Sequence, residues 1–182
     1  MLRNPLEDSI MERLVQAVER MLRGTESVAA LCVLVLTLLV FGNVLARYVF
    51  NVSAMALQEL QWYFYALTFL LAMAPTLRVG GHVRVDIFYA RFPEVWQRRI
   101  DILGTLLLLL PFTGVVLWAS YDFVAYSFAI QEASPNPGGL PAVYVFKAAI
   151  PLSFGLLAAA ALVLVWRRAR GQDHAAAREQ RL

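Results

Sequence analysis

Charged side chains are missing from four long stretches of this sequence, at 28–46, 61–77, 102–121 and 148–166. Each stretch holds about 18 apolar or uncharged residues, and at a rise of 1.5 Å per residue this length crosses a hydrocarbon core of about 30 Å. The sequence therefore predicts an all-α membrane protein with four transmembrane helices. The expected spans are about 28–48, 60–77, 100–123 and 143–166, within a membrane domain at 27–168.

Cysteine and histidine are also scarce. Cys32 is the single cysteine, so no disulfide can form within the chain. The two histidines, His82 and His174, are too far apart in the sequence to suggest a metal-ligand cluster. No glycine-rich phosphate loop, nucleophile elbow or paired-carboxylate spacing typical of a catalytic site is found. With 182 residues and 60% apolar side chains there is no room for a soluble catalytic domain, so we expect neither an enzyme nor a bound cofactor or metal.

Basic residues are nearly absent from two of the five segments outside the apolar stretches. Of the 16 Lys and Arg, four lie before the first stretch, five between the second and third, and five after the fourth, leaving only Arg47 and Lys147 elsewhere. Cytoplasmic loops carry the excess of Lys and Arg. This distribution predicts that both termini and the second loop of a multi-pass membrane protein are cytoplasmic. The net charge of +3 then reflects topology and does not indicate a nucleic-acid partner.

The first 26 residues predict an amphipathic helix. We expect Gly24 and Thr25 to turn the chain from this helix into the first span, and no cleaved signal peptide is indicated. The helix either lies in the lipid interface or docks on a partner subunit. A polar tail at 169–182 ends the chain. The apolar residues at helical spacing are Leu6, Ile10, Leu14, Val18 and Met21.

The second loop carries the densest group of polar residues. Polar and apolar residues alternate between His82 and Ile87, which predicts an extended segment after a tight turn at Gly80-Gly81. The positive charge of an ordinary cytoplasmic loop would explain the arginines, but not the alternation of polar and apolar residues, the carboxylate and the Gly-Gly turn. We therefore expect Asp86 either to brace the loop through hydrogen bonds or to contact a partner. His82 is either a hydrogen-bonded loop residue or a pH sensor. The candidate residues here are Arg78, Gly81, His82, Arg84 and Asp86.

Prolines predict three local features. Pro111 should kink the third span and Pro151 the fourth. Proline has no N–H to donate to the carbonyl four residues earlier, so the carbonyls of Leu107 and Lys147 should be freed. Between the third and fourth spans, the segment 134–141 contains three prolines and two adjacent glycines. This composition excludes helix and strand and predicts a rigid elbow.

The spans also lack an ionisable residue at their centres. Small proton-coupled exporters with four spans need a titratable carboxylate within the membrane. Here Glu59, Asp101 and Asp122 all lie near the ends of spans. Sodium sites can be built from carbonyl oxygens, so an autonomous transporter stays an alternative, as does a free-standing membrane anchor. An accessory membrane subunit is favoured.

The order and spacing of several short motifs resemble the small membrane subunit of TRAP transporters (tripartite ATP-independent periplasmic), of the DctQ type. The resemblance covers about residues 30–168. Its motifs are Asn43-Val44-Leu45-Ala46-Arg47-Tyr48, Glu59, Gly81-His82-Val83-Arg84-Val85-Asp86 with Pro93, and Gly138-Gly139-Leu140-Pro141 followed by Lys147, Ile150, Pro151, Leu152 and Phe154.

The resemblance implies a scaffold subunit that assembles with a large membrane subunit holding the substrate and ion sites. It also implies a periplasmic binding protein that delivers an organic acid, and uptake driven by an ion gradient, usually of sodium. Outside the second loop, the candidate structural or subunit-interface residues are Arg47, Glu59, Gly139, Pro141, Lys147 and Pro151.

Overall fold

The structure is a computed structural model that describes residues 5–78 and 92–170. All regular secondary structure in these residues is helical. Four helical segments are long and apolar enough to cross a membrane, which confirms the prediction of an all-α protein with four spans. The elements are α1 (Pro5–Val49), α2 (Met55–Arg78), α4 (Glu94–Gly104), η1 (Thr105–Leu109), α5 (Leu110–Ala129), α6 (Val143–Lys147) and α7 (Ala149–Arg170).

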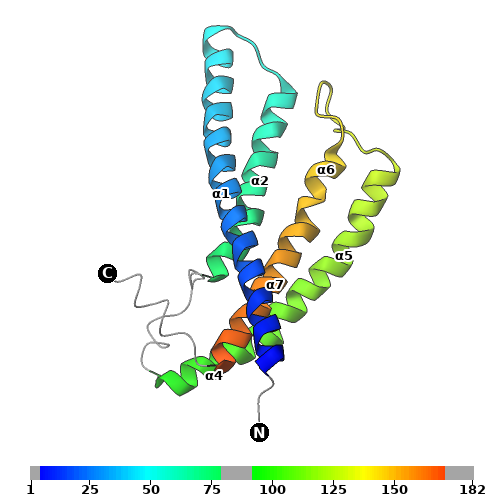
Figure 1. Cartoon of the computed structure of the whole chain (residues 1–182). Coiled ribbons are helices and arrows are strands. Elements are labelled where there is room, and N and C mark those ends of the chain that lie inside the picture. The colour runs from blue at the N-terminus through cyan, green and yellow to red at the C-terminus, as the bar shows by residue number, and fades with distance from the viewer. Residues whose placement is uncertain (1–4, 79–91, 171–182) are drawn as a thin grey trace.

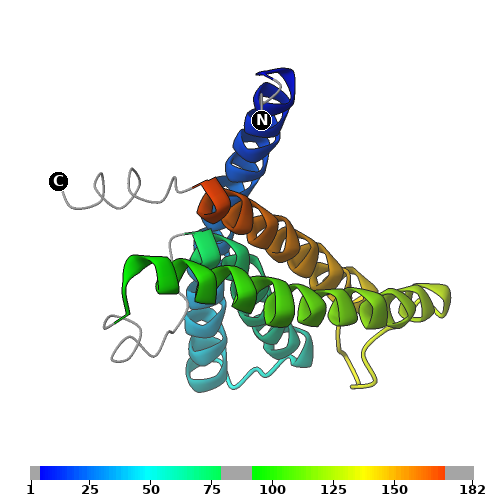
Figure 2. The same ribbon diagram turned by 90° about the horizontal axis from the view of Figure 1, so that it is seen from below.

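The helices form an open array in which α7 is central. It packs against α2 and α5, and also against α1 and α4, and it is the most buried of the four spans. The pair α1–α2 and the pair α5–α7 converge near the N-terminus and diverge toward their opposite ends (Figure 1). In the view from below, α1, α7 and α5 cross at angles to one another and do not form a closed ring (Figure 2).

The α1 helix runs unbroken from Pro5 to Val49, so the expected turn at Gly24 and Thr25 is wrong. Gly24 has open space around its Cα, and the hydroxyl of Thr25 donates to the carbonyl of Leu22 at 2.9 Å. A threonine hydroxyl can donate in this way to the preceding turn while its backbone stays helical. The apolar pattern on both sides therefore continues as one helix.

The N-terminal part of α1 belongs to the core of the chain itself. Leu22 is 1% exposed and joins a cluster made by α2 and α7. Val18 packs against the same cluster, and Val15 is buried. Neither expected arrangement, a helix lying on lipid or one docked only on a partner, allowed for this intramolecular packing. The other members of the cluster are Ala74, Leu77, Leu156, Leu157, Ala160 and Ala161.

An irregular helical turn precedes the proline of the third span and that of the fourth. A π-helical turn, η1, ends just before Pro111, and the Leu110 N–H reaches back to the Thr105 carbonyl. In the fourth span the helix breaks at Ala148, between α6 and α7, three residues before Pro151. The missing N–H of each proline removes one helical hydrogen bond, and the backbone adjusts in the preceding turn.

Candidate functional site

The most developed polar site lies where the two helix pairs diverge, at the beginning of α2. Glu59 is buried there, with 4% of its surface exposed. Its carboxylate accepts from the Asn136 side-chain amide at 2.8 Å, from the Leu140 backbone N–H at 2.8 Å and from the Ser134 hydroxyl. All three donors belong to the connection between α5 and α6. One carboxylate of α2 therefore anchors a loop that comes from the other helix pair.

The loop is also held by its own backbone. The Ser134 N–H donates to the Leu140 carbonyl at 2.9 Å, and the Gly139 N–H donates to the Asn136 carbonyl at 3.0 Å. The Ser134 hydroxyl also accepts from the Asn136 N–H at 3.1 Å. As predicted, this segment is neither helix nor strand. The three prolines of the expected rigid elbow are thus supplemented by hydrogen bonds across the loop.

The two glycines of this loop are required for different reasons. Gly138 has a φ of +73°, a left-handed conformation that L side chains rarely adopt. At Gly139, an added Cβ would lie 2.6 Å from the Ser134 Cβ and 2.9 Å from a Glu59 carboxylate oxygen. Gly139 is therefore the residue that lets the loop approach Glu59 closely.

A second ionic group joins α5, the same connection and α6. The Glu132 carboxylate pairs with Lys147 at 2.5 Å and accepts from the hydroxyl of Ser127, which is fully buried. The Lys147 ammonium also lies 4.2 Å from the centre of the Phe123 ring. The hydrogen bond from Lys147, followed by that from Ser127, lowers the pKa of the Glu132 carboxyl below its ordinary value of 4.5. This group therefore ties the end of α5 and the following connection to α6.

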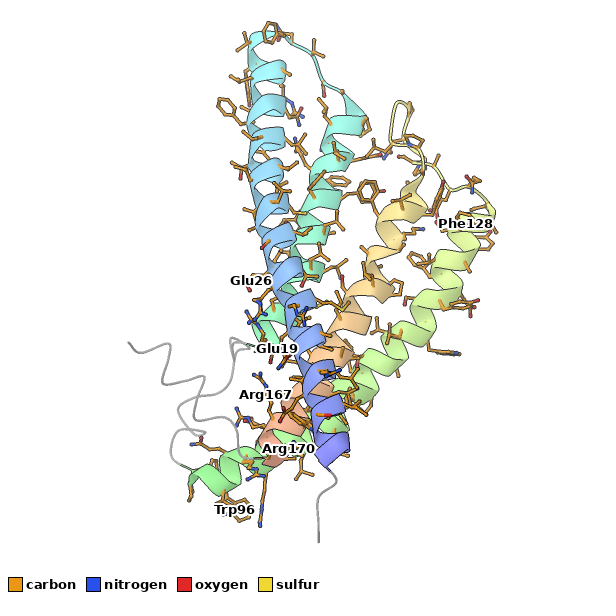
Figure 3. All side chains as sticks on the ribbon, viewed as in Figure 1. Glu19, Glu26, Trp96, Phe128, Arg167 and Arg170 are labelled. Atoms are coloured by element: carbon orange, nitrogen blue, oxygen red, sulfur yellow. The ribbon has the colours of Figure 1, made fainter. Side chains whose placement is uncertain are left out.

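The opposite end of the array is held by ion pairs between helices. Glu19 of α1 pairs with Arg167 of α7, and the two side chains lie together in Figure 3. Glu26 of α1 pairs with Arg78 of α2 at 3.0 Å. Arg168 of α7 pairs with Asp101 of α4 at 2.5 Å. Charged residues therefore join the helices at both ends of the array, and the spans between them are uncharged.

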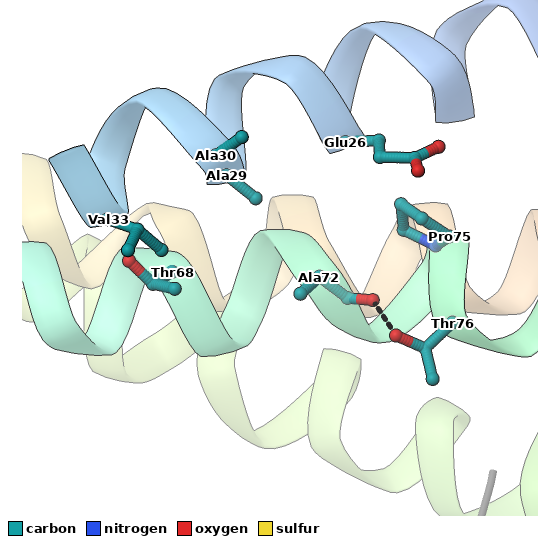
Figure 4. A pocket seen from close by; sticks show the side chains of 8 residues that line it. All are labelled: Glu26, Ala29, Ala30, Val33, Thr68, Ala72, Pro75 and Thr76. Atoms are coloured by element: carbon teal, nitrogen blue, oxygen red, sulfur yellow. Dashed lines mark hydrogen bonds between the residues drawn. The ribbon is translucent and has the colours of Figure 1, made fainter. Parts of the chain in front are cut away.

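A shallow groove of about 270 Å³ separates α1 from α2 (Figure 4). Its walls are mostly apolar and small, including Ala29, Ala30 and Ala72, and Glu26 stands at one end. The Thr76 hydroxyl donates to the Ala72 carbonyl at 2.7 Å, so it is occupied by its own helix. The groove offers no chemistry beyond van der Waals contact. Among the described residues, no three His, Cys, Asp or Glu side chains are grouped so as to hold a metal ion.

The predicted candidate residues do not gather at a single site. Glu59 and Gly139 meet at the anchored loop, and the exposed Pro141 follows two residues after Gly139. Lys147 belongs to the Glu132 group, and Arg78 pairs at the opposite end. Arg47 is exposed in the last turn of α1, and Pro151 lies in the first turn of α7. Four further candidates lie outside the described residues: Gly81, His82, Arg84 and Asp86.

Sequence reasoning missed the partners of these residues. Ser134 and Asn136 alternate with prolines in the elbow, and this spacing could have marked them as side chains that hold the turn. Glu132 stands between the third span and a lone lysine, which could have suggested the ion pair. Nothing local marked Ser127, because a serine in an apolar helix usually bonds its own backbone.

The fold and the site define a multi-pass membrane protein whose polar groups connect its own helices. Residues 36–171 match the sequence profile of the family described as tripartite ATP-independent periplasmic transporters, DctQ component. The match covers well over half of the chain, and the chain belongs to this family, the small membrane component of TRAP transporters. This confirms the resemblance seen in the sequence and places the protein among transporter components rather than enzymes. No curated protein matches the chain at a significant level.

Proposed function

We propose that this protein is the scaffold subunit against which a larger membrane subunit carries out ion-driven uptake of an organic acid. The observation that carries the proposal is the position of its charges. Charged groups join helices at both ends of the array, and the centres of the spans carry no charged side chain. Ionisable residues within the membrane mark ion and substrate pathways, whereas a scaffold requires only helices held at fixed positions.

The open shape of the array supports an assembly. Large apolar side chains along the described helices are exposed, among them Phe41 at 62% and Trp118 at 77%. Lipid can cover part of this surface, and a large membrane subunit can cover part. We propose that this larger subunit holds the substrate and ion sites, with sodium as the coupling ion.

The anchored loop gives the outer end of the subunit a fixed shape. With both termini and the second loop in the cytoplasm, as the charge distribution predicts, the loop at 134–140 faces the periplasm. A periplasmic binding protein that delivers the organic acid would then meet a preformed surface. Preformed loops lower the entropic cost of association.

The second loop is the proposed contact on the cytoplasmic side. Asp86 either braces this loop or touches the larger subunit, and in both cases the effect is on assembly. Asp86→Ala should reduce complex formation or uptake without changing which acid is preferred. A changed substrate preference would contradict the scaffold role.

Reconstitution tests the proposed function directly. The purified chain in liposomes with an inward sodium gradient should take up no organic acid, whether or not a binding protein is added. The chain should co-purify with the larger membrane subunit, and the complex with its binding protein should transport. Sodium-driven uptake by the chain alone would establish the autonomous transporter instead. A chain that neither co-purifies nor affects uptake on deletion would be a free-standing membrane anchor.

A further inference from the structure

The first half of α1 reaches well outside the hydrocarbon core. The helix of 45 residues is about 68 Å long, roughly twice the thickness of the core. Its uncharged part begins only at Val28, and the residues before Val28 include both acids and arginines. The part of α1 before Val28 is therefore surrounded by headgroups, water or protein, and lipid tails do not explain its exposed apolar residues.

Two apolar strips follow this part of the helix, and only one is covered. Val15, Val18 and Leu22 face the core of the chain. Ile10, Leu14 and Met21 remain 59%, 56% and 57% exposed. We call the uncovered strip the α1 stripe, and it consists of Ile10, Leu14, Ala17 and Met21.

The spacing of the α1 stripe is that of a helix–helix seam. Its residues are separated by four, three and four positions, which is the alternation of a and d positions in a coiled coil. Such a seam is narrower than the apolar face of a helix that lies in a lipid interface. The small Ala17 at its centre allows a second helix to approach closely. The pattern therefore fits a single docked helix.

The charges beside the stripe indicate the chemistry of that helix. Glu19 and Glu26 face the chain itself, where they pair with Arg167 and Arg78. Arg13 and Arg20 border the stripe, are exposed, and form no ion pair within the described residues. A second copy of this chain would oppose these two arginines with its own arginines and with one acid, Glu7, which lies three positions before Ile10 on the same seam. A partner helix bordered by Asp or Glu is complementary.

We propose that the α1 stripe docks an amphipathic helix of the larger membrane subunit whose apolar contact face is bordered by carboxylates. This inference rests on the proposed function, because it takes the partner from that assembly. It adds the surface that is used, the kind of helix that is bound and the sign of its charge.

Cysteine labelling of the purified complex tests the α1 stripe. Replacing the buried Cys32 by Ala leaves a chain without cysteine, into which Leu14→Cys or Arg23→Cys is introduced. Arg23 lies about two and a half turns from Leu14, on the opposite side of the helix, and is also exposed. With the larger subunit bound, the rate of maleimide labelling at Leu14→Cys should fall about tenfold, whereas the rate at Arg23→Cys should change less than about twofold.

Other occupants of the stripe give different results, and each would overturn the proposal. A disulfide between two copies of the Leu14→Cys chain would identify a homodimer contact. In nanodiscs containing brominated lipid, quenching of a fluorophore at Leu14→Cys that the larger subunit does not relieve would identify a lipid contact. Equal labelling with and without the larger subunit, in a chain that co-purifies, would reject the stripe and leave the proposed function intact. If the unsubstituted chain does not co-purify with the larger subunit, the result contradicts both the docking at the α1 stripe and the proposed function.

A second pair of variants separates docking from folding. Leu14→Gln with Met21→Gln should reduce co-purification at least about fivefold while the isolated chain keeps its unfolding temperature, because both side chains are exposed in it. Arg13→Gln with Arg20→Gln should weaken the complex at low salt and make its stability less dependent on salt. Unchanged co-purification in both double variants would contradict the proposal.

Discussion

At the scale of single residues, Glu59 shows how one buried carboxylate can position a loop. Three donors from the loop converge on it, and the close approach depends on the missing side chain of Gly139. A carboxylate has enough lone pairs to satisfy all three donors. An apolar residue in its place would leave the Leu140 N–H without its partner, which is costly at a buried site. The loop therefore depends on both the charge and the shape of this one side chain.

Glu59→Gln is expected to loosen the loop. The amide of glutamine presents an NH₂ group where the carboxylate accepted hydrogen bonds, so at least one loop donor faces another donor. The midpoint of thermal unfolding in detergent should fall by about 5 °C, and protease cleavage within 134–140 should become faster. Asn136→Ala is the matched control: it removes one exposed donor and leaves the carboxylate its other two. Equal effects of the two substitutions would show that Glu59 does not anchor the loop.

Glu132 gives the structure a dependence on pH. Its pKa is lowered in the folded protein, mainly by Lys147 and then by Ser127. A lowered folded pKa means that the carboxylate stabilises the fold above its ordinary value of 4.5, and that this contribution is lost as the pH falls through the folded pKa. The difference in unfolding temperature between the unsubstituted chain and Glu132→Gln should be constant near neutral pH and should shrink in acid. A difference that grew as the pH fell would contradict this assignment.

The residues of the site were only partly predictable. Glu59 and Gly139 could be singled out because a lone acid at the start of a span and a glycine pair among prolines are unusual in sequence. Their contact could not, because it joins positions far apart in the chain through a loop that has no periodicity. Lys147 was recognised as exceptional, but its partner Glu132 depends on the backbone turn between α5 and α6. Local patterns identify special residues, and tertiary geometry decides what they touch.

At the scale of elements, α1 is the helix that differed most from expectation. Glycine in a helix costs up to about 1 kcal/mol, which suggested a turn at Gly24. The packing of Val15, Val18 and Leu22 against the rest of the core outweighs that cost. The amphipathic pattern did not predict where this helix packs. Such a pattern shows that one face is covered, but it does not show whether lipid, a partner subunit or the chain itself covers it. In contrast, the irregular turns that precede Pro111 and Pro151 have a local cause, because proline has no N–H to complete the helical hydrogen bond.

Substitutions at two neighbouring residues of α1 separate its two strips. Leu22→Ala removes a side chain that is 1% exposed and should lower the free energy of unfolding by about 3 kcal/mol. Met21→Ala, at a residue that is 57% exposed, should change it by less than about 0.5 kcal/mol in the isolated subunit. Denaturant unfolding of the purified chain in mixed micelles measures both. Similar losses at the two positions would show that the N-terminal part of α1 is not packed as described.

At the scale of the whole molecule, the fold was the most predictable part. The four runs without charge are long enough to cross the bilayer as helices. In lipid every backbone N–H and C=O must be satisfied, and a helix does this within its own segment. The arrangement of the four spans was harder to predict from the sequence. Every span has an apolar surface, so any pair of them could pack together. The central place of α7 rests on small residues such as Ala160 and Ala161, which allow close approach on several sides.

The orientation of the array in the membrane is the prediction on which most of the proposed function depends. Alkaline phosphatase inserted between the exposed Pro137 and Gly138 should be active, because this loop is expected in the periplasm, and a fluorescent protein fused after Leu182 should be bright in the cytoplasm. The excess of arginine at the opposite end gives the physical reason. A reversed pattern would place the Glu59-anchored loop in the cytoplasm, where it cannot meet a periplasmic binding protein. The α1 stripe would then lie in the periplasm, although its docking to the larger subunit would still be measurable, so the two proposals can be separated by one topology experiment.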